Sequence, residues 1–209
     1  MLQRLRAGEQ GSGSQHPAAP RGYEVMTPMS TAVGEGQATR PMAILIGDVE
    51  IPDRYIFSVG PVVLAAACQE IFTRVRGLGM LHGGQIVKMF GDSFVAVFDD
   101  ILSAFRAATG LRQSLDEKPV GGGLRVTLSL HYGNVTLTKA AHGEDIYGDA
   151  VYFAAKVSNE AEQGGITLSA PFFAALPVDA KPSVRMTEHI LKGVGKAELY
   201  HVVPATTGA

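Results

Sequence analysis

The sequence predicts an α+β fold with a ferredoxin-like split βαβ core, whose elements follow the order strand, helix, strand, strand, helix, strand (βαββαβ). Two observations predict this order. Apolar residues recur at helical spacing in two long segments, and short apolar runs bounded by glycine, proline or aspartate precede and follow them. In such a core the first and third strands lie side by side at the centre of the sheet.

The first strand and the first helix are predicted from residue 42 onward. The continuous apolar run MAILIG (42–47) is typical of a strand buried on both faces, and Asp48 stands where this strand leaves the sheet. An amphipathic helix is expected behind Gly60-Pro61, because proline suits the first turn of a helix, and Gly83-Gly84 marks its exit. Its apolar positions are Leu64, Cys68, Ile71, Val75 and Leu78.

A hairpin follows this helix. The runs QIVKMF (85–90) and SFVAVF (93–98) flank Gly91-Asp92, a pair that favours a two-residue connection. Lys88 lies inside the first run, where a buried ammonium group is costly without a partner. Lys88 therefore either recognises a ligand or extends its charged end to water.

The second helix and the next strand complete the core. Asp99 or Asp100 can cap a helix whose apolar face runs to Leu115, and Pro119 with three glycines ends it. The strand LRVTLSLHYG (124–133) follows, and we expect His131 to be a core residue of this strand rather than a catalytic base.

Composition excludes several classes of protein. A chain of 209 residues is long enough for one domain, which we place at residues 41–204. Residues 1–40 are rich in Gly, Ser, Pro and Ala, which predicts a disordered arm, either regulatory or without a role. The net charge of −2 argues against a nucleic-acid partner. The single cysteine fits a reducing, cytoplasmic setting, and we find no apolar run that approaches the roughly 20 residues of a membrane span.

The predicted fold brings two carboxylates together. If the first strand ends at the edge where the second and third strands turn, Asp48 and Asp92 meet at that edge. Converging carboxylates repel one another unless a cation neutralises them, and hard oxygen ligands suit Mg²⁺ or Mn²⁺. The alternative is that Asp92 is a turn residue and Asp48 a strand terminator.

Four segments, in order, resemble the catalytic domain of class III adenylate and guanylate cyclases over about residues 42–203. HGGQIVKMFGDSFVAVF is similar to the family's segment with the second metal aspartate, and LRVTLSLHYGNV to its glycine-ended strand. DIYGDAVYFAAKV is similar to its loop-and-helix motif, and LKGVGKAELYHVV to its closing hairpin. The resemblance thus adds a C-terminal helix and hairpin extension to the core.

The resemblance implies a phosphorus–oxygen lyase that converts a nucleoside triphosphate into a 3′,5′-cyclic nucleotide and pyrophosphate. Two Mg²⁺ or Mn²⁺ ions per site would be held by Asp48, Asp92 and the carbonyl of Val49, and would promote attack of the ribose 3′-hydroxyl on the α-phosphorus. Lys88 and Asp145 match the pair that recognises adenine, which favours ATP. The family also implies a homodimer with composite sites, in which one protomer supplies the metal ligands and the other reads the base.

The chain departs from the family pattern where the triphosphate would lie. A Gly-Phe-Thr loop is usual after the first metal aspartate, but Ile51, Pro52 and Asp53 stand there, and proline has no N–H to donate. Tyr152 and Lys156 replace an asparagine and an arginine on the helix of the loop-and-helix motif. Lys156 keeps the charge without the bidentate fork, and Tyr152 either serves the reaction or packs at the dimer interface.

Further phosphate contacts are implied on two strands. Thr127 stands where many members have an arginine, and Arg125, two residues away on the same strand, is the expected substitute. Lys192 of the closing hairpin is another candidate. Each donor lost typically lowers the rate by about 100- to 1,000-fold. Three functions therefore stay open: an active cyclase using ATP, a cyclase using a pyrimidine triphosphate, and a binding or dimerisation module without turnover.

Overall fold

The computed structural model describes residues 38–140 and 143–204. In chain order the elements are β1 (Ala38–Glu50), α1 (Asp53–Leu81), β2 (Gln85–Phe90), β3 (Ser93–Phe98), α2 (Ile101–Glu117), β4 (Arg125–Ala140), β5 (Gly143–Tyr147), α3 (Asp149–Asn159), β6 (Ile166–Ser169), α4 (Ala170–Ala175), the 3₁₀ turn η1 (Val178–Ala180), β7 (Val184–Leu191) and β8 (Gly195–Val202). The predicted arm lies almost wholly outside the described residues, and β1 begins before the predicted boundary at residue 41.

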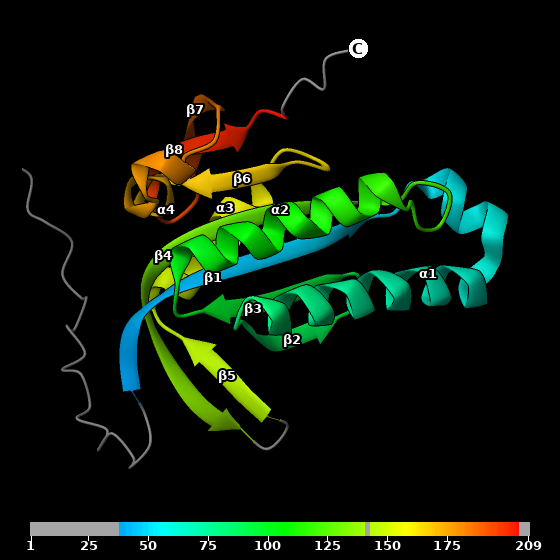
Figure 1. Ribbon diagram of the computed structural model, residues 1–209, viewed down its shortest axis with the longest axis horizontal. Coiled ribbons are helices and arrows are strands. Elements are labelled where there is room, and N and C mark those ends of the chain that lie inside the picture. Colours follow the sequence, from blue (N-terminus) through cyan, green and yellow to red (C-terminus); the bar gives the residue numbers. More distant parts are fainter. Residues whose placement is uncertain (1–37, 141–142, 205–209) are drawn as a thin grey trace, which may run out of the picture. The chain divides into compact units, whose positions relative to one another are not determined.

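The strands form one sheet in the order β2-β3-β1-β4-β6-β8-β7, with β5 paired to β4 (Figure 1). β1 lies between β3 and β4 and is antiparallel to both, so the first and third strands are neighbours, as predicted. β6 runs parallel to β4, and the β7–β8 hairpin extends the sheet beyond β6. The α+β core with its C-terminal helix and hairpin extension is therefore confirmed.

Alternation along β1 divides the core between the two faces of the sheet. Leu45 and Val49 face the layer of α1 and α2, whereas Ile44 packs with Ala150 and Ala154 of α3 on the opposite face. Successive side chains of a strand point to opposite faces, so a run buried on both sides must be apolar throughout. This explains why MAILIG shows no alternation in sequence.

Helix α1 is longer than predicted and is kinked. It begins at Asp53, and Gly60 interrupts it with φ 75° and ψ 165°, so Pro61 starts a second helical segment. The positive φ requires glycine, and the missing N–H of Pro61 costs nothing in a first turn. Cys68 of the second segment is half-buried rather than fully buried, and desolvation raises the pKa of its thiol.

The turn before β3 and the helix cap after it both form where the sequence predicted them. β2 and β3 are joined by Gly91-Asp92, with φ 61° at Gly91. At the other end of β3, the Asp100 side chain accepts a hydrogen bond of 2.7 Å from the backbone N–H of Ser103 and caps α2. The cap identifies Asp100, of the two predicted candidates, as the residue that begins the helix.

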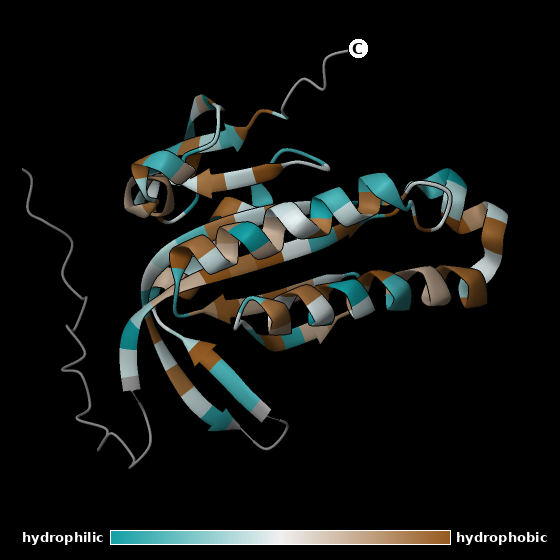
Figure 2. Ribbon diagram, viewed as in Figure 1, coloured by the Kyte–Doolittle hydropathy of each residue, from teal (hydrophilic) through white to brown (hydrophobic). Residues whose placement is uncertain are grey.

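Among the described residues, one helix is long and apolar enough to cross a membrane by length and composition. An 18-residue window of α1 has a mean hydropathy of 1.6, and 11% of that window is buried. The prediction rested on uninterrupted apolar runs and missed this helix, because a window average tolerates the serine, glycine and proline that interrupt the apolar residues. Core helices of soluble proteins pass the same test. Apolar side chains are nonetheless exposed on α1, among them Phe57 and Val62. Figure 2 shows that α1 carries many hydrophobic residues along its length.

Two glycines give room to aromatic rings. Gly47 pairs with Phe94 across β1 and β3, and a Cβ atom at Gly47 would lie 2.2 Å from the Phe94 ring. A Cβ atom at Gly84, just before β2, would lie 2.1 Å from the Phe98 ring. Neither position has a positive φ, so the packing of the rings alone requires glycine there. The Phe94 ring thus fixes the backbone immediately before Asp48.

His131 lies in the core, as expected. It is 5% exposed, stacks on Phe153 with ring centroids 4.6 Å apart, and its Nδ1 lies 2.8 Å from the Ser169 hydroxyl. Desolvation lowers the pKa of His131 to about 4 from 6.5. Between these pH values the unfolded chain binds a proton that the folded chain does not, so stability is lost as the pH falls from 6.5 towards 4.

We therefore predict that the unfolding free energy of the wild type falls by about 2 kcal/mol more than that of His131→Phe between about pH 7 and about pH 4.5. Phenylalanine keeps the stacking on Phe153 but has no titrating group. Urea unfolding of both proteins at the two pH values measures the difference. Parallel pH dependences would show that His131 is not the titrating group.

Candidate functional site

The register between β1 and β3 brings the two predicted aspartates to one edge of the sheet. Asp48 of β1 pairs with Ser93 of β3, and the N–H of Val49 donates a hydrogen bond of 2.9 Å to the carbonyl of Asp92. The carboxylates therefore come from the end of one strand and from the adjacent turn. This is the meeting that the split βαβ order predicted.

One hydroxyl touches both carboxylates. Ser93 Oγ lies 2.5 Å from Asp48 Oδ1 and 3.4 Å from Asp92 Oδ1. A hydroxyl carries a single proton, so Ser93 donates to Asp48 at the shorter distance. No basic side chain forms an ion pair with either aspartate within the described part of the chain. Two carboxylates of like charge close together and without a cationic side chain fit a divalent cation.

The second oxygen of Asp48 is bound from the other side of the sheet edge. Ser158, near the end of α3, donates a hydrogen bond of 3.0 Å to Asp48 Oδ2. Both oxygens of Asp48 thus accept from serine hydroxyls that stand on different elements. Neither serine was predicted. Ser93 directly follows Asp92 in the sequence, whereas nothing local to Ser158 indicates a contact with a residue 110 positions earlier.

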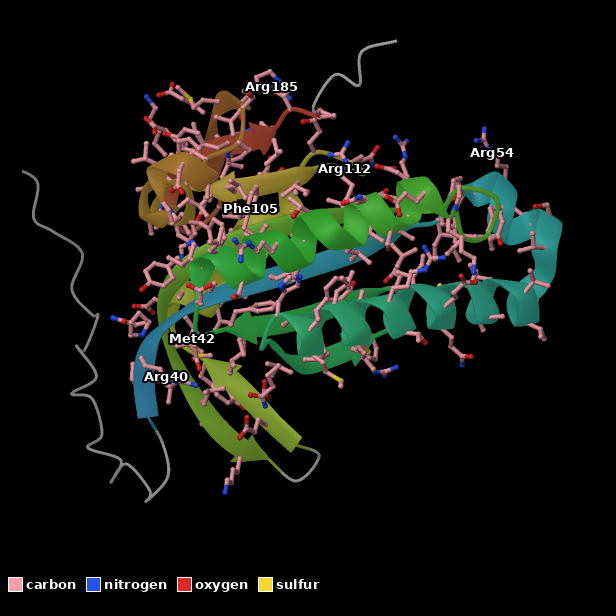
Figure 3. All side chains as sticks on the ribbon, viewed as in Figure 1. Arg40, Met42, Arg54, Phe105, Arg112 and Arg185 are labelled. Carbon is pink, nitrogen blue, oxygen red and sulfur yellow. The ribbon has the colours of Figure 1, made fainter. Side chains whose placement is uncertain are left out.

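The loop after β1 lines a cavity of about 410 Å³. Ile51, Pro52 and Asp53 contribute to its wall together with the guanidinium-bearing Arg54 and Arg125. Arg54 projects from the start of α1 (Figure 3). The cavity lies where the resemblance expects phosphates, and its charge is mixed because Glu50 also lines it. Arg125 thus lies beside the loop after β1, although the described structure does not bring it to Asp48 or Asp92.

Comparison with known proteins places the chain in a family. The model of the adenylate and guanylate cyclase catalytic domain matches residues 35–204. The chain belongs to this cyclase family. No protein of curated function matches it.

Solved structures of cyclase domains share the fold. A rhodopsin-guanylyl cyclase core with converted specificity, in complex with ATPαS, is 17% identical and has a TM-score of 0.72, over 80% of this chain and 98% of that one. The adenylyl cyclase CyaB from P. aeruginosa is 17% identical with a TM-score of 0.68, over 83% and 98%. The guanylate cyclase domain of RhGC from Catenaria anguillulae, in complex with GTP, is 16% identical with a TM-score of 0.69, over 79% and 97%.

Tyr152 and Lys156 form a unit in this cyclase domain. The Lys156 ammonium group lies 4.9 Å from the centroid of the Tyr152 ring, a cation–π contact between residues one helical turn apart. The Tyr152 hydroxyl lies 3.4 Å from the carbonyl of Lys192, in the turn between β7 and β8. A Cβ atom at Gly193 would lie 2.5 Å from that hydroxyl. The structure therefore brings the side chains of Tyr152 and Lys156 together beside the backbone of Lys192.

The predicted base-reading pair stands on two strands that lie close together but are not paired in the sheet. Lys88 is exposed on β2 and Asp145 is half-buried on β5, and the side chains of Gln85 and Glu144 join these strands by a hydrogen bond. Asp145 accepts a hydrogen bond of 2.8 Å from the N–H of Ile146. Within residues 38–140 and 143–204 no ion pair links Lys88 to Asp145. The second oxygen of Asp145 accepts a hydrogen bond of 3.3 Å from the Tyr147 hydroxyl, so Lys88 is the exposed charged group of this pair.

Thr127 has a structural role. It is 5% exposed, and its hydroxyl donates to Glu50 Oε1 at 2.5 Å while accepting from the N–H of Gly164 at 2.7 Å. These bonds tie the end of β1 to the loop before β6. The position that carries a phosphate-binding arginine in many members therefore fixes the backbone here.

Proposed function

We propose that this chain is a nucleotidyl cyclase that converts ATP into 3′,5′-cyclic AMP and pyrophosphate. The observation that carries the proposal is the pair of carboxylates, Asp48 and Asp92, which share the Ser93 hydroxyl and have no cationic side chain as partner among the described residues. Membership of the cyclase family supports the reaction class. Lys88 and Asp145 support ATP, since an ammonium group can donate to N1 of adenine and a carboxylate can accept from its amine.

The roles of the residues follow from their chemistry. Asp48 and Asp92, with the carbonyl of Val49, would hold Mg²⁺ or Mn²⁺, two per site. Such cations, when bound, neutralise the triphosphate and make the ribose 3′-hydroxyl more acidic. Lys156 presents a positive charge to the reacting phosphates from its place on the Tyr152 ring. Lys192 in the β7–β8 turn and Arg125 by the phosphate loop are the further basic groups assigned to the triphosphate.

The composite site needs a second copy of the chain. Large apolar side chains are exposed on α1 and on the β2–β3 turn: Phe57, Val62, Met80, Leu81 and Phe90. A stable interface buries about 800 Å² of surface on each partner. Groups of large exposed apolar side chains commonly mark such interfaces. We assign this surface to a homodimer in which one protomer supplies the carboxylates and the other supplies Lys88 and Asp145. A cytoplasmic setting is part of the same proposal, because ATP is its substrate.

A cyclase-like module without turnover is the second candidate. Pro52 brings no N–H and Asp53 brings a negative charge to the loop that lines the phosphate-side cavity. The lysine at position 156 has no planar fork for a transferring phosphoryl group. A third candidate, a pyrimidine nucleotide as substrate, rests on the same remodelled pocket. The three candidates differ in product, so one assay separates them.

Purified protein incubated with ATP, GTP, CTP or UTP and Mg²⁺ or Mn²⁺ should form cyclic AMP from ATP, as measured by mass spectrometry. We expect Asp48→Ala and Asp92→Ala to lower the rate at least about 100-fold, because each removes a carboxylate for the cation. Asp99→Ala, at the opposite end of β3, is the matched control and should keep full activity. Wild-type turnover in either site variant at saturating Mn²⁺ would refute the metal assignment. Cyclic CMP or UMP, or no product at all, would favour the other candidates.

The composite arrangement predicts complementation between two inactive variants. Asp48→Ala and Asp145→Ala should each be nearly inactive alone, whereas a mixed dimer retains one site with every group present. Random pairing at equal amounts makes half of the dimers mixed, each with one working site of two, so activity should return to about a quarter of the wild-type value. Co-expression with two affinity tags provides the mixture. Mixed dimers seen by native mass spectrometry without activity would disprove the shared site.

The basic unit on α3 can be tested by restoring the family residues. We predict that Tyr152→Asn combined with Lys156→Arg raises turnover by roughly tenfold, because the fork of arginine donates two hydrogen bonds to one phosphate group. Steady-state kinetics with ATP measures the change, and urea unfolding checks that the fold is kept. A fall in turnover with unchanged stability would mean that the Tyr152–Lys156 pair is the working arrangement of this chain.

A further inference from the structure

Both carboxylate oxygens of Asp48 accept hydrogen bonds from serine hydroxyls, although the residue stands at an edge of the sheet. Its Oδ1 accepts from Ser93 at 2.5 Å and its Oδ2 accepts from Ser158 at 3.0 Å. The two donors approach from different elements, β3 and α3, so the plane of the carboxylate is fixed from both sides. Asp92, in contrast, is exposed, and its recorded side-chain contact is the longer one to Ser93.

The Ser158 hydroxyl is delivered by a well-anchored helix. Val157, the preceding residue, is fully buried against Leu191 and Leu199, and Ala154, one turn earlier, is 2% exposed against β1. Ser158 itself is half-buried. Among the described contacts its hydroxyl bonds to Asp48 and not to a backbone carbonyl of α3. Its position is therefore set by packing, and its one side-chain bond is aimed at the metal carboxylate.

We propose that Ser158 is a positioning residue that orients Asp48 for a divalent cation and so sets the metal affinity of the site. The inference rests on the proposed function, since it takes Asp48 as a metal ligand. Each carboxylate oxygen has two lone pairs, so a serine hydrogen bond occupies one and leaves the other for the cation. Without Ser158 the carboxylate turns more freely about its Cβ–Cγ bond, and the cation must order it on binding. Loss of such supporting hydrogen bonds typically costs about 10- to 100-fold in metal affinity.

The experiment measures Mn²⁺ binding directly, without nucleotide, by electron paramagnetic resonance of the free ion. Ser158→Ala should weaken Mn²⁺ binding by about 10- to 100-fold, whereas Ser158→Thr keeps a hydroxyl and should stay within about threefold of the wild type. The matched control is Ser129→Ala. The Ser129 hydroxyl is buried without a hydrogen-bond partner in the described structure, so its removal should leave Mn²⁺ binding unchanged.

Measurements of stability and of cyclase activity distinguish a local effect on Asp48 from misfolding and from a failure of the proposed function. Urea unfolding without metal should change little in Ser158→Ala, which excludes a general loss of structure as the cause. Unchanged Mn²⁺ affinity in Ser158→Ala, equal weakening in Ser158→Thr, or no Mn²⁺ binding by the wild type would each overturn the inference. If Mn²⁺ binds, Ser158→Ala weakens it and Asp48→Ala abolishes it while no triphosphate is cyclised, the proposed function fails and the role of Ser158 stands.

Discussion

The hydrogen bond from the N–H of Val49 to the carbonyl of Asp92 is the constraint on which the candidate site depends. It continues the β1–β3 ladder by one step into the turn, so that the carboxylates of Asp48 and Asp92 meet beside one hydroxyl. A shift of one residue would turn Asp48 towards the layer of α1 and α2, because alternate residues of a strand face opposite sides. The buried residues on both faces of β1 prevent this shift. Packing of the core therefore keeps Asp48 next to Asp92.

The basic groups are organised differently from the carboxylates. The carboxylates depend on backbone pairing, whereas Lys156 depends on the ring of Tyr152, and Tyr152 on the carbonyl of Lys192. A planar guanidinium would hold its own geometry in hydrogen bonds to phosphate, but an ammonium group on a flexible stem does not. An aromatic neighbour limits that freedom. Tyr152 and Lys156, the two residues of α3 that depart from the family pattern, thus contact one another. Tyr152 also connects the helix to the turn of the C-terminal hairpin.

Much of the fold was predictable because its signals are local. Local patterns of a few residues predicted the Gly91-Asp92 turn, the Asp100 cap and the strands. The predicted order of strands and helices then placed Asp48 close to Asp92. The early start of α1 at Asp53 was missed because a Gly-Pro pair is typical of the first turn of a helix. In this chain the pair forms a kink inside a longer helix. Ser158 was missed because its contact with Asp48 depends on how α3 packs over the sheet. The place of Arg125 beside the loop after β1 was equally beyond the sequence, because a long side chain at a strand end can reach several surfaces.

The Gly47–Phe94 pair of β1 and β3 limits which substitutions the sheet can accept. The Phe94 ring fills the space that a side chain at position 47 would take, so it can lie there only while position 47 stays glycine. A larger residue at position 47 therefore needs a smaller residue at position 94, and a stable exchange would have to change both positions. Because position 47 precedes Asp48, this packing also holds the backbone of the strand that carries the candidate site, and we expect relatives to keep or lose both residues together.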